Sequence, residues 1–211
     1  MNLLIIFPIS NNYFSVYFVS LVLGYILGSI PFGFIVARLR GVDIRSTGSK
    51  NIGFTNVNRI MGSTLAIPVL IFDIAKGFLP TFFASRLGLI PAIVGLGTVL
   101  GHIFTPWLSF KGGKGVATAI GVMSALTPIA LAGGVVILLI ILFGFSFMSL
   151  ASLSFAVSLP ILVFFLYREQ KFVLILTILI AILIIIRHKT NIIKLVQKTE
   201  SKISFLKLRK N

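Results

Sequence analysis

The chain has 211 residues, of which 57% are hydrophobic and 11% are charged, and its formal net charge is +15. Soluble domains carry about 45–50% apolar and about 25% charged residues, so this composition excludes an ordinary soluble domain and indicates a polytopic membrane protein. The absence of cysteine excludes disulfides, thiol catalysis and thiolate metal sites.

The long apolar runs predict the membrane spans, because a helix needs about 20 apolar residues to cross the bilayer. In chain order the runs are 13–37, 62–83, 89–106, 115–131, 133–147, 150–167 and 172–186. The fourth and fifth form one apolar stretch that is interrupted by Pro128 and by Gly133-Gly134, so six spans is the alternative. Because the spans share one lipid-embedded core, we expect a single integral-membrane domain over residues 1–211.

Lysine and arginine residues indicate the orientation, since cytoplasmic loops are enriched in them. With the N-terminus outside, most basic residues fall on the inner side, and the outer loops keep Arg86, Arg168 and Lys171. We therefore predict an all-α polytopic membrane protein with about seven transmembrane helices, an outside N-terminus and a cytoplasmic C-terminus. A six-span chain would place the basic tail, about 198–211, outside. This topology explains the net charge without nucleic acid, and the tail is expected to lie on anionic lipid headgroups.

Three polar, glycine-containing segments interrupt the apolar pattern, and the charge argument places all of them on the inner face. They are 41–62, 101–118 ("GHIFTPWLSFKGGKGVAT") and 187–200. The short turn 149–152 falls on the same side. We expect these segments to converge on one site.

The side chains of these segments predict the charge of the ligand. They are rich in donors and cations, and Asp43 and Glu200 are their only carboxylates. A glycine-rich turn that opens a helix, here Gly112-Gly113 followed by a helix near Val116, is typical of an anion site. The ligand is therefore predicted to be anionic and phosphorylated, and two phosphates can be present at once. The donors and cations are Arg45, Ser49, Lys50, Asn51, Thr55, Asn56, Arg59, Lys111, Lys114, His188, Asn191 and Lys194.

Each of these features also has a simpler structural interpretation. A single basic residue in an inner loop is more often a topology signal, and Gly24 and Gly28 are typical of close helix packing. Asp73 and Lys76, inside the second run, fit a functional pair and a structural ion pair equally well. His102, near a helix end, could simply bind a backbone carbonyl. The clustering of the segments is what favours a binding site.

Other site classes are not indicated. The sequence GGKG is not a nucleotide P-loop, because Gly115 follows Lys114 where the P-loop has Ser or Thr. Two histidines with so few carboxylates make a catalytic metal improbable, so neither a metal nor a cofactor is predicted.

The three segments resemble motifs of the bacterial acyl-phosphate:glycerol-3-phosphate acyltransferase family. Residues 43–59 are similar to "DIRxxGSGNxGATNvxR", residues 101–118 to "GHxFPvfLkFKGGKGVAT", and residues 187–200 to "RHrxNIxRLLxGxE". The resemblance extends over essentially the whole chain, including "GSIPFG" at residues 28–33 and "FDIAKG" at residues 72–77.

The resemblance implies an enzyme of the bacterial cytoplasmic (inner) membrane with its active site on the cytoplasmic face. It implies transfer of a fatty acyl group from acyl phosphate to the 1-hydroxyl of glycerol 3-phosphate, the first acylation step of phospholipid synthesis. The soluble enzyme that makes acyl phosphate would be a partner. By analogy, glycerol 3-phosphate is held by Ser49, Arg59, Lys114 and Asn191. The donor phosphate is lined by Asn51, Thr55, Gly112, Gly113, Ser152 and His188, and Arg45 and His102 are further candidate substrate-binding residues.

The chain also departs from the motifs. Lys50 stands where the family usually has glycine, and Phe54 where it has alanine. None of the departures removes a site residue named above, although loop geometry and donor preference depend on such positions.

The reaction explains why no carboxylate base is needed. Acyl phosphate is already activated, so the protein has to hold two anions in the right geometry, and proximity can supply about 7–11 kcal/mol. The donor's own phosphate can take the hydroxyl proton; His102 or His188 is the alternative base. The alternative function is a transporter or channel for phosphate or a phosphorylated metabolite, but such sites lie near the bilayer midplane, often in inverted repeats, and no repeat is visible here.

Overall fold

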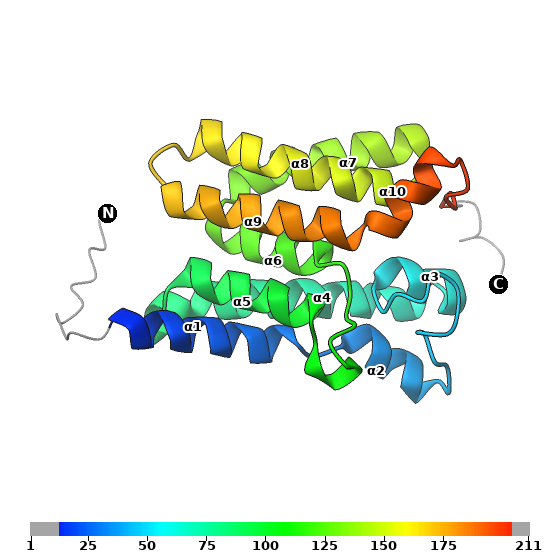
Figure 1. Cartoon of the computed structure of the whole chain (residues 1–211), viewed down its shortest axis with the longest axis horizontal. Helices are drawn as coiled ribbons and strands as arrows, with labels where there is room; N and C mark the ends of the chain where they lie inside the picture. The colour runs from blue at the N-terminus through cyan, green and yellow to red at the C-terminus, as the bar shows by residue number, and fades with distance from the viewer. Residues whose placement is uncertain (1–12, 204–211) are drawn as a thin grey trace.

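The computed structural model describes residues 13–203, and within this range all the regular elements are helices, with no strand. The helices lie roughly side by side in two layers with α6 between them (Figure 1). One layer holds α1 to α5, and the other holds α7 to α10. The bounds are α1 (Tyr13–Gly28), α2 (Phe32–Leu39), α3 (Phe54–Met61), α4 (Ser63–Phe83), α5 (Pro91–Ile103), α6 (Val116–Leu126), α7 (Pro128–Phe145), α8 (Met148–Leu166), α9 (Lys171–Arg187) and α10 (Lys189–Val196), with 3-10 turns η1 (Ala84–Leu87) and η2 (Pro106–Leu108).

Among the described residues 13–203, five helical segments are long and apolar enough to cross a membrane: Tyr13–Leu39, Ser63–Leu87, Pro91–Leu108, Pro128–Phe145 and Met148–Leu166. A sixth is formed only if α9 and α10, which meet at a bend of 59°, count as one span. The remaining apolar helix, α6, has 11 residues and is about 16 Å long at 1.5 Å per residue. The predicted all-α membrane fold is confirmed, whereas the count of seven and the orientation stay predictions.

The predicted boundary between the fourth and fifth runs was wrong. The helix α6 ends just before Thr127, and α7 begins at Pro128, whose missing N–H suits the first position of a helix. Gly133 and Gly134 continue α7. A Cβ built on Gly134 would lie 3.1 Å from the ring of Phe155, so this glycine serves close packing against α8.

The contact between α1 and α5 depends on glycines from both helices. A Cβ on Gly28 would collide with the carbonyl oxygen of Thr98, and a Cβ on Gly101 would collide with that of Tyr25. Gly24 and Gly97 make the same backbone approach one turn away. The close packing predicted for Gly24 and Gly28 is confirmed. On α5, Gly97 and Gly101 form a second pair of glycines with the same spacing, and they pack against α1.

The short segment between α1 and α2 is contacted by residues from several other elements. The buried Lys76 donates a hydrogen bond to the carbonyl of Ile30 at 2.8 Å and pairs with Asp73 at 2.7 Å. Ser29 accepts from Trp107 at its side chain and from Thr105 at its carbonyl. Lys76 thus ties α4 to the break between α1 and α2, a contact that fits the structural interpretation of the Asp73–Lys76 pair.

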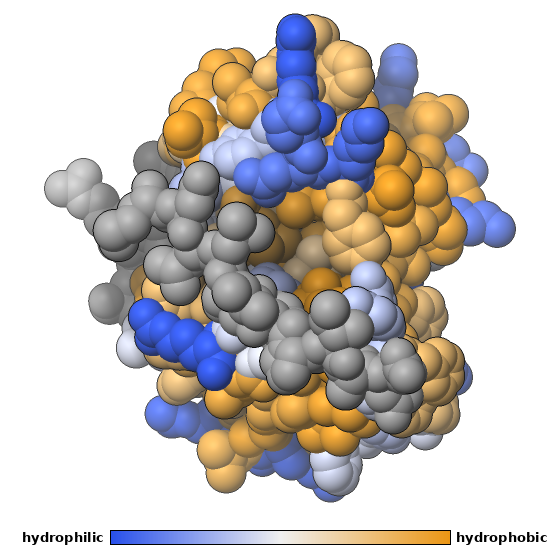
Figure 2. Space-filling view, turned by 90° about the vertical axis from the view of Figure 1, so that its left-hand side faces the viewer, coloured by the Kyte–Doolittle hydropathy of each residue, from blue (hydrophilic) through white to orange (hydrophobic). Residues whose placement is uncertain are grey.

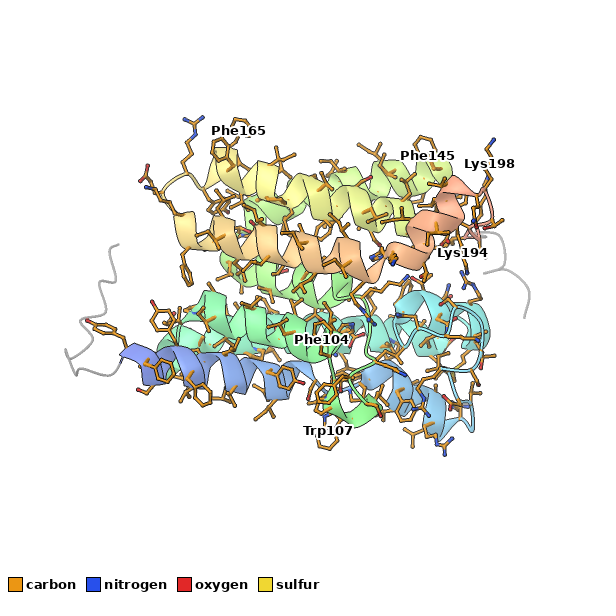
Figure 3. All side chains as sticks on the ribbon, in the orientation of Figure 1. Phe104, Trp107, Phe145, Phe165, Lys194 and Lys198 are labelled. Atoms are coloured by element: carbon orange, nitrogen blue, oxygen red, sulfur yellow. The ribbon has the colours of Figure 1, made fainter. Side chains whose placement is uncertain are left out.

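The two ends of the molecule differ in their surface. Figure 2 shows the end that carries the α8–α9 turn, where groups of hydrophilic residues lie on a mostly apolar surface. The opposite end carries α3, α10 and the last described residues (Figure 1), and there lie Lys194 of α10 and Lys198, which follows that helix (Figure 3). Of the predicted basic tail, 204–211 lies outside the described residues. The preceding part folds back on the chain, since the amide of Ile203 donates to the carbonyl of Ser146 at 2.8 Å.

Candidate active site

A cavity of about 440 Å³ opens among the three polar segments at the α3–α10 end of the molecule. It brings together most of the residues predicted from the sequence. Those that line it are Ser49, Asn51, Thr55, Asn56, Arg59, His102, Lys114, Ser152, His188, Asn191 and Lys194. The predicted convergence of the segments is therefore present in the structure.

Four helices begin at this cavity. The first turns of α3, α6, α8 and α10 contribute Thr55, Val116, Ser149 and Asn191 to its wall. The N–H groups of a helix's first turn have no intrahelical acceptor, and the helix dipole places partial positive charge there. Four such ends around one cavity make it a site for phosphate groups.

The first polar segment is held in shape by Asn56, which is 1% exposed. Its side-chain oxygen accepts the amide of Ser49 at 2.8 Å, and its side-chain nitrogen donates to the carbonyls of Thr47 and Asn51. Asn56 thus fixes the loop that presents Ser49 and Asn51 to the cavity. The sequence counts it only as one more donor in a polar segment, and no local pattern distinguishes it from Asn51 or Asn58.

The GGKG loop is fixed by contacts to two helices. The amides of Gly112 and Gly113 donate to the carbonyls of Ile103 and His102 at 3.0 Å, and Arg187 donates to both glycine carbonyls. These amides are therefore used inside the loop, and neither glycine lines the cavity. The expectation that they line the donor's phosphate is not supported by this placement. The residues at the start of α6 that line the cavity are Gly115, Val116 and Ala117.

Lys114 is the cation that this loop positions. Its ammonium donates to the side-chain oxygen of Asn191 on α10 at 2.5 Å. Burial lowers the pKa of Lys114 to about 8; the carboxylate of Glu200 opposes this shift, and Arg187 and Arg59 add to it. The lysine is thus charged at neutral pH but close to the range in which it loses its proton.

Glu200 is a site residue that was not predicted. Its Oε1 accepts hydrogen bonds from Asn191 at 2.8 Å and from Ser149 at 3.0 Å, and the residue lines the cavity. It reaches this place because Lys198 adopts φ 57° and turns the chain back after α10. The only signal in the sequence was its position at the end of the third motif, since charge patterning treats it as a lone acid in a basic tail.

The two histidines occupy different settings. His188 is 2% exposed, and its Nδ1 lies 2.8 Å from the carbonyl of Ile184. A carbonyl only accepts, so Nδ1 carries the proton and Nε2 is left as an acceptor. Burial, with a smaller contribution from Lys114, lowers the pKa of His188 to about 4, so the ring is neutral at neutral pH.

His102 belongs to the buried wall of the cavity. Its Nδ1 lies 3.6 Å from the carboxylate of Asp73, and a Cβ built on Gly113 would collide with its Nε2 edge. Both ring nitrogens therefore face other parts of the protein. This setting gives His102 a part in shaping the GGKG loop.

Arg45 is not brought to the cavity. Its guanidinium makes two hydrogen bonds to Asp43, at 3.0 and 2.9 Å, and stacks 4.9 Å from the ring centroid of Phe34. The same contacts, with the Arg45 amide, lower the pKa of the Asp43 carboxyl to about 2. The prediction that Arg45 binds substrate is not supported by this placement, because the short Asp43–Arg45 spacing lets the pair satisfy itself.

Comparison with known proteins identifies the family. Residues 18–198 match the family model described as glycerol-3-phosphate acyltransferase. The glycerol-3-phosphate acyltransferase of Fusobacterium nucleatum is 41% identical over 193 residues, covering 90% of this chain and 99% of the relative. That of Geobacter sulfurreducens is 42% identical over 181 residues, covering 84% of this chain and 93% of the relative.

Solved structures agree with this match. PlsY (YgiH), an integral membrane glycerol 3-phosphate acyltransferase in its glycerol 3-phosphate form, superposes with a TM-score of 0.86 at 36% identity, over 91% of this chain and 98% of that one. Its lysophosphatidic acid form gives a TM-score of 0.83 over 91% and 97%. These likenesses favour an acyltransferase over the transporter alternative. The chain, an integral membrane protein, therefore belongs to the glycerol-3-phosphate acyltransferase family.

Proposed function

We propose that this acyltransferase takes its acyl group from a fatty acyl phosphate and transfers it to the 1-hydroxyl of glycerol 3-phosphate. The products are 1-acyl-glycerol 3-phosphate and inorganic phosphate. The observation that supports this most directly is the convergence of four helix N-termini with Lys114 and Arg59 on one cavity, because such a site suits two phosphate groups at once.

Glycerol 3-phosphate would be held by its phosphate at Lys114, Arg59, Ser49 and Asn191. Lys114 and Asn191 already contact each other, so the substrate phosphate would join an existing pair. Because Asn191 also donates to Glu200, its side-chain oxygen is directed toward Lys114. Binding in a fixed orientation brings the 1-hydroxyl to the reacting carbonyl, which is the main contribution that proximity makes.

The donor would enter with its chain in the apolar part of the cavity. Leu70, Ile120 and Leu138 line this part, from α4, α6 and α7. Its phosphate would lie beside Asn51, Thr55, Ser152 and His188, close to the helix N-termini. The positive ends of the helix dipoles, at these N-termini, stabilise the negative charge that develops on the leaving phosphate.

The proposed chemical step needs no enzyme nucleophile. The hydroxyl oxygen attacks the acyl carbon, the bond between that carbon and the phosphate oxygen breaks, and phosphate leaves with the electron pair. The hydroxyl proton passes to a phosphate oxygen of the donor. His188, whose pKa is lowered to about 4, is a weaker base than the donor phosphate at neutral pH and is not needed to take this proton.

The enzyme would lie in the bacterial cytoplasmic membrane as one domain, with the cavity on the cytoplasmic face. The abundance of basic residues near α3, α10 and the GGKG loop supports this orientation. The acceptor then arrives from the cytoplasm, and the donor arrives from the lipid or from the soluble enzyme that makes it.

The donor is tested with purified protein, radiolabelled glycerol 3-phosphate and one palmitoyl donor at a time. We expect labelled product with palmitoyl phosphate and none with palmitoyl-CoA or palmitoyl-acyl carrier protein. Product from the thioesters alone would overturn the donor assignment. The matched control is the Lys114→Met variant, which should give no product with any donor.

A further inference from the structure

A second hollow, of about 380 Å³, lies beside the reaction cavity. Three segments line it: the loop at Ser49–Asn51, the GGKG loop, and the junction of α9 with α10. The residues that line both spaces are Ser49, Asn51, Lys114, Asn191 and Lys194, and the contact between Lys114 and Asn191 forms part of the wall between the two spaces. We call this second hollow the outer recess.

The outer recess is lined by cations that the proposed reaction does not use. Lys50, Lys111 and Lys189 line it, are exposed, and take no part in the wall of the reaction cavity. No carboxylate is found among the described residues that line it. By contrast, the reaction cavity contains Asp73 and Glu200. The recess is thus the more strongly cationic of the two spaces.

Lys50 stands out because its backbone would suit a different residue. It has φ 60°, a left-handed conformation that glycine adopts freely and that a side chain with a Cβ disfavours. The position is also one at which the related motif has glycine. A lysine held in this conformation adds a charge to the recess at a cost in backbone strain, which points to a use for the charge.

We propose that the outer recess is a second binding site for a phosphomonoester or phosphate dianion, placed in series with the reaction cavity. Lys50, Lys111 and Lys189 attract the dianion from water, and Lys114 receives it at the shared wall. The dianion has two sources under the proposed function, on which this inference rests: glycerol 3-phosphate on its way in and inorganic phosphate on its way out. Clustered charge of one sign raises the local concentration of such an ion and its association rate.

The test is Lys50→Gly, which removes the charge and suits the backbone, so loss of fold is not expected. Lys50→Arg keeps the charge. Arg40→Gln removes one exposed cation that lines neither hollow and is the matched control. For each variant, KM for glycerol 3-phosphate, kcat and the inhibition constant of inorganic phosphate are measured at low and at high salt.

We expect Lys50→Gly to raise KM for glycerol 3-phosphate about threefold or more at low salt with kcat unchanged, as loss of a steering charge should. The difference should shrink at high salt, because exposed charges are screened. A rise in KM alone assigns the site to the incoming substrate, a rise in the phosphate inhibition constant alone assigns it to the product, and a rise in both assigns it to both. No change in either constant, or an equal change in Arg40→Gln, overturns the proposal.

Failure of the proposed function is recognised separately. If palmitoyl phosphate gives no product, binding of radiolabelled inorganic phosphate is measured by equilibrium dialysis without any acyl donor. Weaker binding by Lys50→Gly than by Arg40→Gln still supports the outer recess, and equal binding by the two variants overturns it.

Discussion

Lys114 and Asn191 are separated by 77 positions in the chain, and their side chains meet in a hydrogen bond between the GGKG loop and the first turn of α10. This contact joins the second and third polar segments. It also lies between the reaction cavity and the outer recess, since both residues are among those that line both spaces. The side-chain oxygen of Asn191 faces the lysine because its nitrogen is engaged by Glu200.

The first prediction concerns the charge of Lys114. Lys114→Met should lower kcat/KM for glycerol 3-phosphate at least about 30-fold, because losing one partner of a buried charged contact costs about 2–5 kcal/mol. The folded protein should remain, as judged by its thermal melt in detergent. Lys202→Met, at an exposed lysine that lines neither hollow, is the control. Activity near that of the parent enzyme in Lys114→Met would contradict the proposed role.

The second prediction is a pH dependence. Lys114 is charged below its pKa of about 8 and neutral above it, so its attraction for phosphate is lost as the pH rises. We expect kcat/KM for glycerol 3-phosphate to fall as the pH rises through about 8. In the Lys114→Arg variant this fall in kcat/KM should be absent, because arginine keeps its charge in this pH range. The same fall in kcat/KM in the arginine variant would assign the titration to another group.

The third prediction uses the contact between Gly113 and His102. Gly113→Ala should lose most activity, since its Cβ would collide with the His102 ring and displace Lys114 next to it. Replacing the ring with a small side chain makes room, so the double variant Gly113→Ala, His102→Ser should be more active than the product of the two single effects predicts. Activities of the four proteins form a double-mutant cycle. Purely additive effects would show that the collision is not the cause.

Sequence patterns predicted the apolar helices and the three segments of the site well, because the length of an apolar run and the positions of charged residues can be read directly from the sequence. The contacts of Glu200 and Arg45 could not be predicted, because each depends on a partner that only the folded chain supplies. Glu200 reaches the cavity through a left-handed turn at Lys198, and Arg45 is withdrawn by Asp43. The meeting of four helix N-termini is likewise a tertiary property, which the order of the elements alone does not give.

The boundary at Thr127 shows a similar limit. Both Pro128 and the pair Gly133-Gly134 interrupt the apolar run, and either could end a helix. Because they lie only a few residues apart, the sequence does not show which of them does so. The structure breaks the chain at the proline and keeps the glycines inside α7, where α8 packs against them. Which of the two interrupts a helix is decided by the neighbouring helix.

The fourth prediction tests the packing of α1 on α5. Gly101→Ala should destabilise the protein by about 1–3 kcal/mol, the range for overpacking, because its Cβ would collide with the Tyr25 carbonyl. Gly144→Ala is the matched control, since a Cβ there meets nothing within 4 Å and the helix gains about 0.5–1 kcal/mol. Thermal melts in detergent should move in opposite directions for the two variants. A lower melting temperature for both would mean that any added methyl group is harmful.

The fifth prediction decides the orientation. The chain has no cysteine, so single cysteines can be introduced without a background. Gln170, in the α8–α9 turn, and Gln197, after α10, are both exposed and flank the bent helix pair. If the cavity faces the cytoplasm, a membrane-impermeant maleimide should label Gln170→Cys in intact cells and should label Gln197→Cys only after the membrane is opened. The reverse pattern would place the cavity outside and would contradict the cytoplasmic supply of glycerol 3-phosphate. Labelling of both residues in intact cells would show that α9 does not cross the membrane, and the span count would then have to be reduced.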